Sequence, residues 1–148
     1  MEEVIFAMIT LKETIKSVMQ ESDGEVSDGE VPDEEAGEQQ KCEMELFLST
    51  PGGNADDMFA IYDIMRLVRK DCDIKVTGIG KVMSAGVLLL AAGTKGKRRI
   101  GKNCRIMIHS IIGGHTGPMH QILNEVTEFK KIQEQYLNAL VEETSMSK

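Results

Sequence analysis

Strand-like segments alternate with helix-like segments along most of this chain, and that alternation restricts the folds open to it. Residues 44–48, 74–80 and 104–109 are rich in aliphatic and β-branched side chains, as buried strands are. Each of the three is followed by glycine-containing or small residues that end the strand. Strands that alternate with helices favour an α/β architecture, which is the fold class we predict.

The segments between and after these strands have helical character. A turn at 49–54 precedes one predicted helix, whose apolar residues fall on or near one face: Met58, Ile61, Tyr62, Met65, Leu67 and Val68. Residues 84–92 are short and uniformly apolar or small, as a buried helix would be. Pro118 opens a long helix over 118–143 with apolar side chains at three-four spacing. Residues 95–99 read as a solvated basic turn.

The first forty residues have a different composition. Residues 4–8 are predicted to form a strand and 10–20 a helix, but 21–40 are polar, acidic and partly repeated. Residues 17–40 hold nine acidic side chains and no Lys or Arg, of 24 acids and 17 bases in the whole chain. The net charge of −7 therefore belongs to this segment, and we expect 21–40 to be a disordered surface insertion.

Several classes of protein are disfavoured. The 148 residues suit a single domain spanning 1–148, and the longest apolar run, 87–92, is far shorter than a membrane span. Outside the acidic segment the charge is nearly balanced, so neither a nucleic-acid partner nor a membrane partner is expected. Cys42, Cys72 and Cys104 are odd in number and widely spaced, which is not typical of a disulfide framework. A reducing, cytoplasmic location is expected.

Ser84 lies where a strand gives way to a compact apolar helix. At such a position a serine is surrounded by free backbone N–H groups and the positive end of the helix dipole, so an oxyanion site can form beside it. An ordinary helix N-cap serine is the simpler interpretation of this segment.

His109 and the Pro51-Gly52-Gly53 turn also lie at strand ends. His109 can act as a base that projects from the sheet, or it can be a buried structural histidine. Gly53 follows a second glycine, so its N–H can approach a developing oxyanion, although a plain strand-to-helix turn is the alternative. Since strand ends of an α/β sheet commonly gather on one side, the three turns together predict an acyl-transfer site.

Three segments carry a resemblance to a known family. Residues 80–98 (GKVMSAGVLLLAAGTKGKR) resemble the nucleophile segment of the ClpP serine peptidases, and 105–114 (RIMIHSIIGG) resemble their histidine segment. Residues 49–65 are similar to their oxyanion turn and following helix. Carried over position by position, Ser84 matches the nucleophile and His109 the general base. Gly53 and Ala85 match the two residues whose backbone N–H groups form the oxyanion hole.

The resemblance has consequences for the whole protein. It implies a ClpP/crotonase-like spiral of ββα units with a long protruding handle helix at 118–143. It also implies a homo-oligomer of stacked seven-subunit rings, in which unfolded polypeptide is fed by an ATP-driven AAA+ unfoldase. No cofactor is implied, and the three histidines with Cys104 match no standard metal-binding spacing.

The sequence departs from the family in one important respect. The family's catalytic Asp lies downstream of the handle helix, and no Asp follows Asp73 here, so no third triad member is expected in the chain. We therefore expect a truncated member that lacks the usual N-terminal and C-terminal parts, with impaired serine endopeptidase activity. A catalytically silent subunit in mixed rings is the alternative. An acyl-CoA enzyme of related architecture is disfavoured by the Ser/His pair, and the pattern Gly-x-Ser-x-Gly is absent, which disfavours a hydrolase elbow.

Overall fold

The computed structural model describes residues 42–147. The strand predicted at 4–8, the helix at 10–20 and the acidic segment at 21–40 lie outside the described residues. Within the described part, the alternation of strands and helices predicted from the sequence is confirmed. No described helix is both long and apolar enough to cross a membrane.

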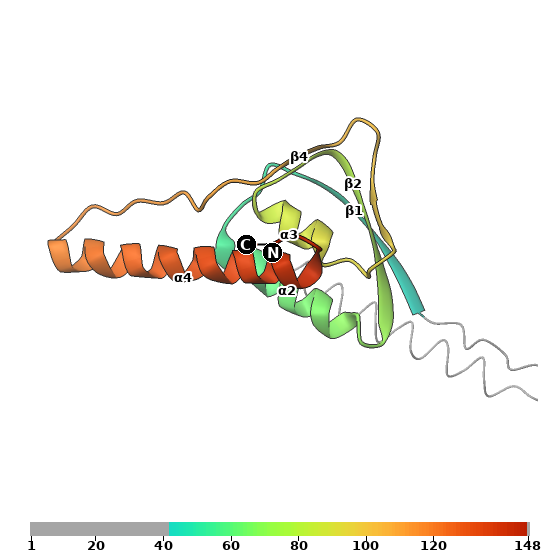
Figure 1. Ribbon diagram of the computed structural model, residues 1–148, viewed down its shortest axis with the longest axis horizontal. Helices are drawn as coiled ribbons and strands as arrows, with labels where there is room; N and C mark the ends of the chain where they lie inside the picture. Colours follow the sequence, from blue (N-terminus) through green and yellow to red (C-terminus); the bar gives the residue numbers. More distant parts are fainter. Residues whose placement is uncertain (1–41, 148) are drawn as a thin grey trace, which may run out of the picture.

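A parallel sheet of four strands is the framework, and β2 lies at its centre (Figure 1). Strand β1 (Cys42–Thr50) runs beside β2 (Cys72–Met83) over most of its length. Two short strands share the other edge of β2: β3 (Arg98–Ile100) pairs with its middle and β4 (Arg105–Met107) with its end. All pairings are parallel, so the chain crosses back between β1 and β2 and between β2 and β3, while β4 continues along β2 in the direction of β3. The ends of β1, β2 and β4 therefore gather on one side.

Helix α3 (Ala85–Ala91) is the centre of the hydrophobic core. It packs against β1, β2, α2 (Ala55–Val68) and α4 (Met119–Glu143). Every α3 residue from Gly86 to Ala91 is buried, which explains why this short segment has no polar face. The core consists largely of aliphatic and methionine side chains from all of these elements, and its largest fully buried members include Met65, Ile74, Leu88 and Val82.

The C-terminal end of α4 is fixed to α2 by a buried carboxylate. Glu143 is only 3% exposed, and the Arg69 guanidinium donates to both of its oxygens at 2.7 and 2.8 Å. The hydroxyl of Tyr62 donates to the same carboxylate at 3.1 Å, and Arg98 donates to the Glu143 backbone carbonyl at 2.7 Å. A bidentate pair of this kind is both strong and directional, so it sets the angle at which α4 leaves the core.

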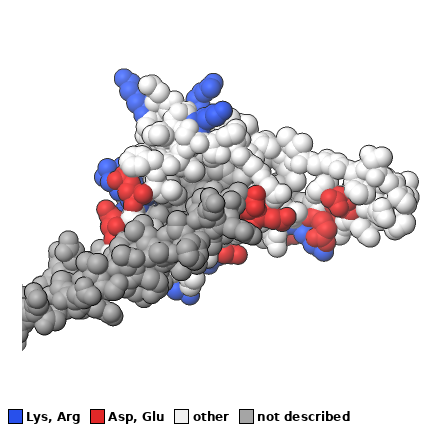
Figure 2. Space-filling model, turned by 180° about the vertical axis from the view of Figure 1, so that it is seen from behind, with Lys and Arg blue, Asp and Glu red and all other residues white. Residues whose placement is uncertain are grey.

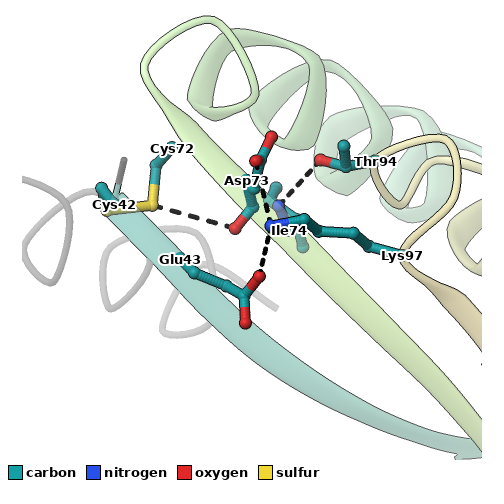
Figure 3. The surroundings of a disulfide bond; sticks show 7 residues. All are labelled: Cys42, Glu43, Cys72, Asp73, Ile74, Thr94 and Lys97. Carbon is teal, nitrogen blue, oxygen red and sulfur yellow. Dashed lines mark hydrogen bonds and ion pairs between the residues drawn. A yellow bond between two sulfur atoms is a disulfide. The ribbon is translucent and has the colours of Figure 1, made fainter. Parts of the chain in front are cut away.

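Cys42 and Cys72 form a disulfide (Figure 3), although the odd number and wide spacing of the cysteines did not indicate a disulfide framework. The two residues open neighbouring parallel strands and are direct partners in the β1–β2 register. Their sequence separation of 30 residues gives no hint of this, because only the pairing of the strands brings the sulfur atoms together. Cys104 is a free thiol.

The basic segment at 95–99 is only partly the solvated turn that was expected. Residues 98 and 99 belong to β3, and the Arg98 guanidinium is half-buried, where it also donates to the carbonyl of Ala91 at 2.9 Å. Lys97 bridges Glu43 and Asp73 beside the disulfide (Figure 3). Lys97 and Arg98 thus bind acceptors within the chain, so these two positive charges are not simply solvated.

The N-terminal half of α4 projects from the body of the molecule, and the chain from 108 to 118 runs beside it (Figure 1). We call residues 108–132 the arm. Lys, Arg, Asp and Glu are sparse toward its tip (Figure 2). Its exposed apolar side chains include Ile112, Met119, Leu123 and Val126, the first of them 84% exposed. The protruding handle helix predicted from the resemblance is therefore present.

Candidate active site

Ser84 occupies a sharp turn between β2 and α3. Its φ of 53° and ψ of −122° make it the one non-glycine residue of the described chain with a positive φ. It stands at the N-cap position of α3, yet its side chain makes no capping hydrogen bond. The interpretation of Ser84 as an ordinary N-cap residue therefore does not fit, and its hydroxyl is left available for another role.

The strained backbone of Ser84 is held from several sides. Its N–H donates to the Met107 carbonyl of β4 at 2.8 Å. Its carbonyl accepts from the Val87 N–H of α3 and from the Tyr136 hydroxyl of α4, both at 3.0 Å. Strain of this type persists only where the surroundings over-determine it, and it is concentrated at functional sites.

The turn from β2 to α3 is tight, although the sequence lacks the Gly-x-Ser-x-Gly motif. The position two residues before Ser84 is Val82, which is fully buried. Space for it comes from two glycines, because a Cβ at Gly78 would lie 3.1 Å from one methyl group of Val82 and a Cβ at Gly86 would lie 3.3 Å from the other. Neighbouring glycines thus leave room for Val82 at this turn, and the expectation that disfavours a hydrolase elbow stays a prediction.

His109 follows β4 by two residues and is half-buried. Its Nδ1 atom lies 2.6 Å from the carbonyl oxygen of Ser110. A carbonyl oxygen only accepts, so this contact is a hydrogen bond when Nδ1 carries the proton, and Nε2 is then free to accept one. Within the described chain no hydrogen bond joins His109 to a carboxylate or to the Ser84 hydroxyl.

The two residues expected to form an oxyanion hole both present backbone N–H groups near Ser84. Gly53 follows Gly52, whose φ of 106° and close approach require glycine: a Cβ there would lie 2.6 Å from the Cβ of Ser84. Ala85 is the first residue of α3. Neither N–H donates to an acceptor among the described residues. Each is therefore free to bind an oxygen brought in by a ligand.

One cavity of about 420 Å³ is lined by all four of these residues, Ser84, His109, Gly53 and Ala85. Apolar side chains of the arm, among them Ile111, Ile112 and Phe129, line the rest of it together with Tyr136. The structure thus brings the end of β1, the end of β2 and the segment after β4 to one place. A cleft of this composition suits an extended, partly apolar chain.

Sequence reasoning missed two polar residues of α4 that contact the segments of the site. Tyr136 and Gln133 read simply as members of the long amphipathic helix, yet Tyr136 contacts the Ser84 carbonyl and Gln133 Oε1 accepts the Ile111 N–H at 2.7 Å. Gln133 is polar on a largely apolar face, and that is the single clue to its role. Among the described residues, no cluster of three or more His, Cys, Asp or Glu side chains is placed to hold a metal ion.

Comparison with known proteins gives consistent matches. The family described as Clp protease matches residues 8–148. The chain is 37% identical over 105 residues to the ATP-dependent Clp protease proteolytic subunit 2 of Chlamydia pneumoniae, which covers 71% of this chain and 51% of that protein. The subunit of the same name from Mycolicibacterium paratuberculosis is also 37% identical over 105 residues, 71% of this chain and 52% of its own.

The chain spans about half the length of these curated relatives. The family match, by contrast, extends over nearly all of the 148 residues. It agrees with the parallel sheet, the buried helix after the serine turn and the projecting α4. The chain belongs to the Clp protease family and has its ClpP/crotonase-like fold.

Proposed function

We propose that this chain acts as the serine endopeptidase subunit of a Clp-type protease. The observation that carries the proposal is the strained Ser84, whose uncapped hydroxyl shares a cavity with His109 and with two free backbone N–H groups. Ser84 Oγ attacks the scissile carbonyl carbon while His109 Nε2 takes the hydroxyl proton. The N–H groups of Gly53 and Ala85 stabilise the oxyanion that forms.

The later steps follow from the same groups. The protonated His109 gives its proton to the leaving amine, which departs and leaves an acyl group on Ser84. Water, deprotonated by His109, then attacks the acyl-enzyme; the bond to Ser84 Oγ breaks, His109 returns the proton to that oxygen, and the second product leaves as the acid. For the first step, Ser84 Oγ and His109 Nε2 must come within hydrogen-bond reach when substrate binds, because catalytic hydrogen bonds are often long without substrate.

The Ser110 carbonyl takes over part of the role that a triad carboxylate would have. By accepting from Nδ1 it selects the tautomer in which Nε2 is the base. A neutral carbonyl stabilises the imidazolium less than a carboxylate does, and disabling the triad Asp of a classical serine protease lowers kcat by about 10⁴-fold. We therefore propose slow turnover that depends on Ser84, with unfolded polypeptide as the substrate.

The assembly and partners belong to the same proposal. The exposed apolar arm suits packing against further copies of the chain, in the stacked seven-subunit rings implied by the resemblance. An AAA+ unfoldase as the feeding partner is proposed on the same basis. The cytoplasmic location expected from the sequence is also proposed, and a reducing compartment would keep Cys42 and Cys72 as thiols there. The alternative, a silent subunit in mixed rings, is favoured by the missing carboxylate next to His109 in the described chain.

A fluorophosphonate probe tests the proposal, because it reacts covalently with an activated serine. We expect labelling of the purified protein at Ser84, located by peptide mass spectrometry, and its loss in Ser84→Ala. Ser110→Ala is the matched control: Ser110 lines the same cavity, and its backbone carbonyl survives the substitution, so labelling should persist. Absence of labelling in the assembled wild-type protein would favour the silent subunit.

A further inference from the structure

One face of α4 contacts the chain beside both members of the proposed catalytic pair. Gln133 Oε1 accepts the Ile111 N–H at 2.7 Å, two residues after His109. The Tyr136 hydroxyl donates to the Ser84 carbonyl at 3.0 Å. Residues three apart on a helix lie on the same face, so a single rigid element touches both segments.

The Tyr136 contact is well placed to fix the serine turn. Tyr136 is 4% exposed, and burial raises the pKa of its hydroxyl, which therefore stays protonated and donates. The carbonyl that it binds belongs to Ser84, the one non-glycine residue of the described chain with a positive φ. The other hydrogen bonds of the Ser84 backbone are to Met107 of β4 and Val87 of α3. The Tyr136 hydroxyl therefore adds a contact from a third element, α4.

The Gln133 contact fixes the segment that carries His109. Residues 108–118 form no strand or helix, so their backbone depends on contacts with α4. Gly113 lies so close to Phe129 that a Cβ would collide with the ring. Together with the Gln133 bond to Ile111, this contact holds the segment along α4 over more than one helical turn.

We propose that Tyr136 and Gln133 are positioning residues of the active site: from one face of α4 they set the serine turn and the histidine segment relative to each other. The proposal deepens the proposed function and rests on it for its catalytic consequence. Its structural content, that the Tyr136 hydroxyl holds the Ser84 turn, can be tested without any turnover.

The chain supplies a matched control, because it contains a second buried tyrosine whose hydroxyl donates. Tyr62 is also 4% exposed, but its hydroxyl bonds to Glu143, and it does not line the cavity. Tyr136→Phe and Tyr62→Phe each remove one hydroxyl and keep the ring. For Gln133→Met, the exposed Gln135→Met two residues away is the control.

The experiment measures two quantities in the assembled wild-type protein and the variants. One is the rate of fluorophosphonate labelling at Ser84. The other is amide hydrogen exchange in the peptides that contain Val87, whose N–H bonds to the same Ser84 carbonyl, and Ile111. We expect Tyr136→Phe to slow labelling about tenfold, the factor typical of one net hydrogen bond, and to speed exchange at Val87. Gln133→Met should slow labelling and speed exchange at Ile111, while Tyr62→Phe and Gln135→Met leave these quantities unchanged.

The outcomes separate the two proposals. If Tyr136→Phe matches Tyr62→Phe in both labelling and exchange at Val87, the positioning role is overturned. Faster exchange with unchanged labelling also overturns it, since the hydroxyl would then hold the turn without setting the nucleophile. If the wild-type protein is not labelled, the proposed function fails, and the exchange at Val87 still decides whether Tyr136 holds the turn.

Discussion

The two ends of this molecule are held in opposite ways. At the start of the sheet, the Cys42–Cys72 disulfide and the Lys97 ion pairs join the strands, and Glu143 fixes the last turn of α4 to α2. The arm has no such attachments toward its tip, where it projects from the body and carries few charges (Figures 1 and 2). Its apolar side chains are exposed. The last turn of α4 belongs to the anchored end and its N-terminal half belongs to the arm. The two ends therefore differ in their contacts within the chain and not in helical propensity.

The two ends differ in how much of their polar and apolar surface is paired within the chain. The anchored end satisfies its polar groups within the chain, and it therefore provides a rigid base for the β2–α3 turn that carries Ser84. The arm leaves apolar side chains exposed to water, and burying them against another surface would lower the free energy. The candidate active-site cavity lies where the arm leaves the body: arm residues such as Ile112 and Phe129 line it together with Gly53 and Ser84 of the strand-to-helix turns. The following predictions test this division, in order of their effect on the free energy of unfolding.

Reduction of the disulfide should have the largest effect. In the chain-entropy account, a bond that closes a loop of 30 residues stabilises the fold by roughly 3.5 kcal/mol. Urea unfolding with and without a reducing agent measures this, and the double substitution Cys42→Ser with Cys72→Ser should reproduce the reduced state. Cys104→Ser is the control and should leave the response to reductant intact. An unfolding midpoint that ignores the reductant would contradict the disulfide.

Glu143→Ala should destabilise the protein by about 3 kcal/mol, because it leaves the Arg69 charge and the Tyr62 hydroxyl without their shared partner. The neighbouring Glu142→Ala is the matched control. Glu142 pairs with Arg66 at the surface, where both side chains are about half exposed, so its loss should cost less than about 1 kcal/mol. Equal effects of the two substitutions in urea unfolding would show that the buried pair does not anchor α4.

The same carboxylate should make stability depend on acid pH. Burial alone would raise the pKa of Glu143, but the hydrogen bonds and charge of Arg69 outweigh it, and the pKa lies below the ordinary value of 4.5. A carboxyl group with a lowered pKa in the folded state stabilises fully above pH 4.5, and this contribution is lost as the pH falls through the folded pKa. Unfolding midpoints measured from pH 6 downward should therefore fall less steeply in Glu143→Gln than in the wild type.

Substitutions on the arm should have the smallest effect on unfolding and a clear effect on assembly. Met119→Gln and Leu123→Gln alter side chains that are 70% and 58% exposed, so the fold itself should change by less than about 0.5 kcal/mol. The mass measured by light scattering should nevertheless fall relative to the wild type. Lys131→Gln, a charged position on the same helix, is the control. A wild-type protein that is a monodisperse monomer at micromolar concentration would refute self-association.

Much of the fold follows from local sequence patterns. The segments 44–48, 74–80 and 104–109 are strands in the structure, with somewhat different ends, because β-branched and aliphatic runs favour buried parallel strands. The apolar stretch at 84–92 forms a buried helix for the same reason. Ser84, His109 and the Gly52-Gly53 turn could be named because each lies at a strand end, and parallel strands deliver such ends to one side. The resemblance to the ClpP peptidases implied their roles and added Ala85.

The sequence by itself determined most of the described strands and helices, β3 excepted, and which strand ends carry reactive groups, because these depend on periodicity and on local turn chemistry. Tertiary structure alone decided the pairing of Cys42 with Cys72, the bridging by Lys97, and the contacts of Tyr136 and Gln133 with the site. Each of these joins groups that are distant in the chain, and their distances are set by strand register and helix packing. A tyrosine in an amphipathic helix has the same pattern whether its hydroxyl meets Glu143, as in Tyr62, or the carbonyl of the strained Ser84, as in Tyr136.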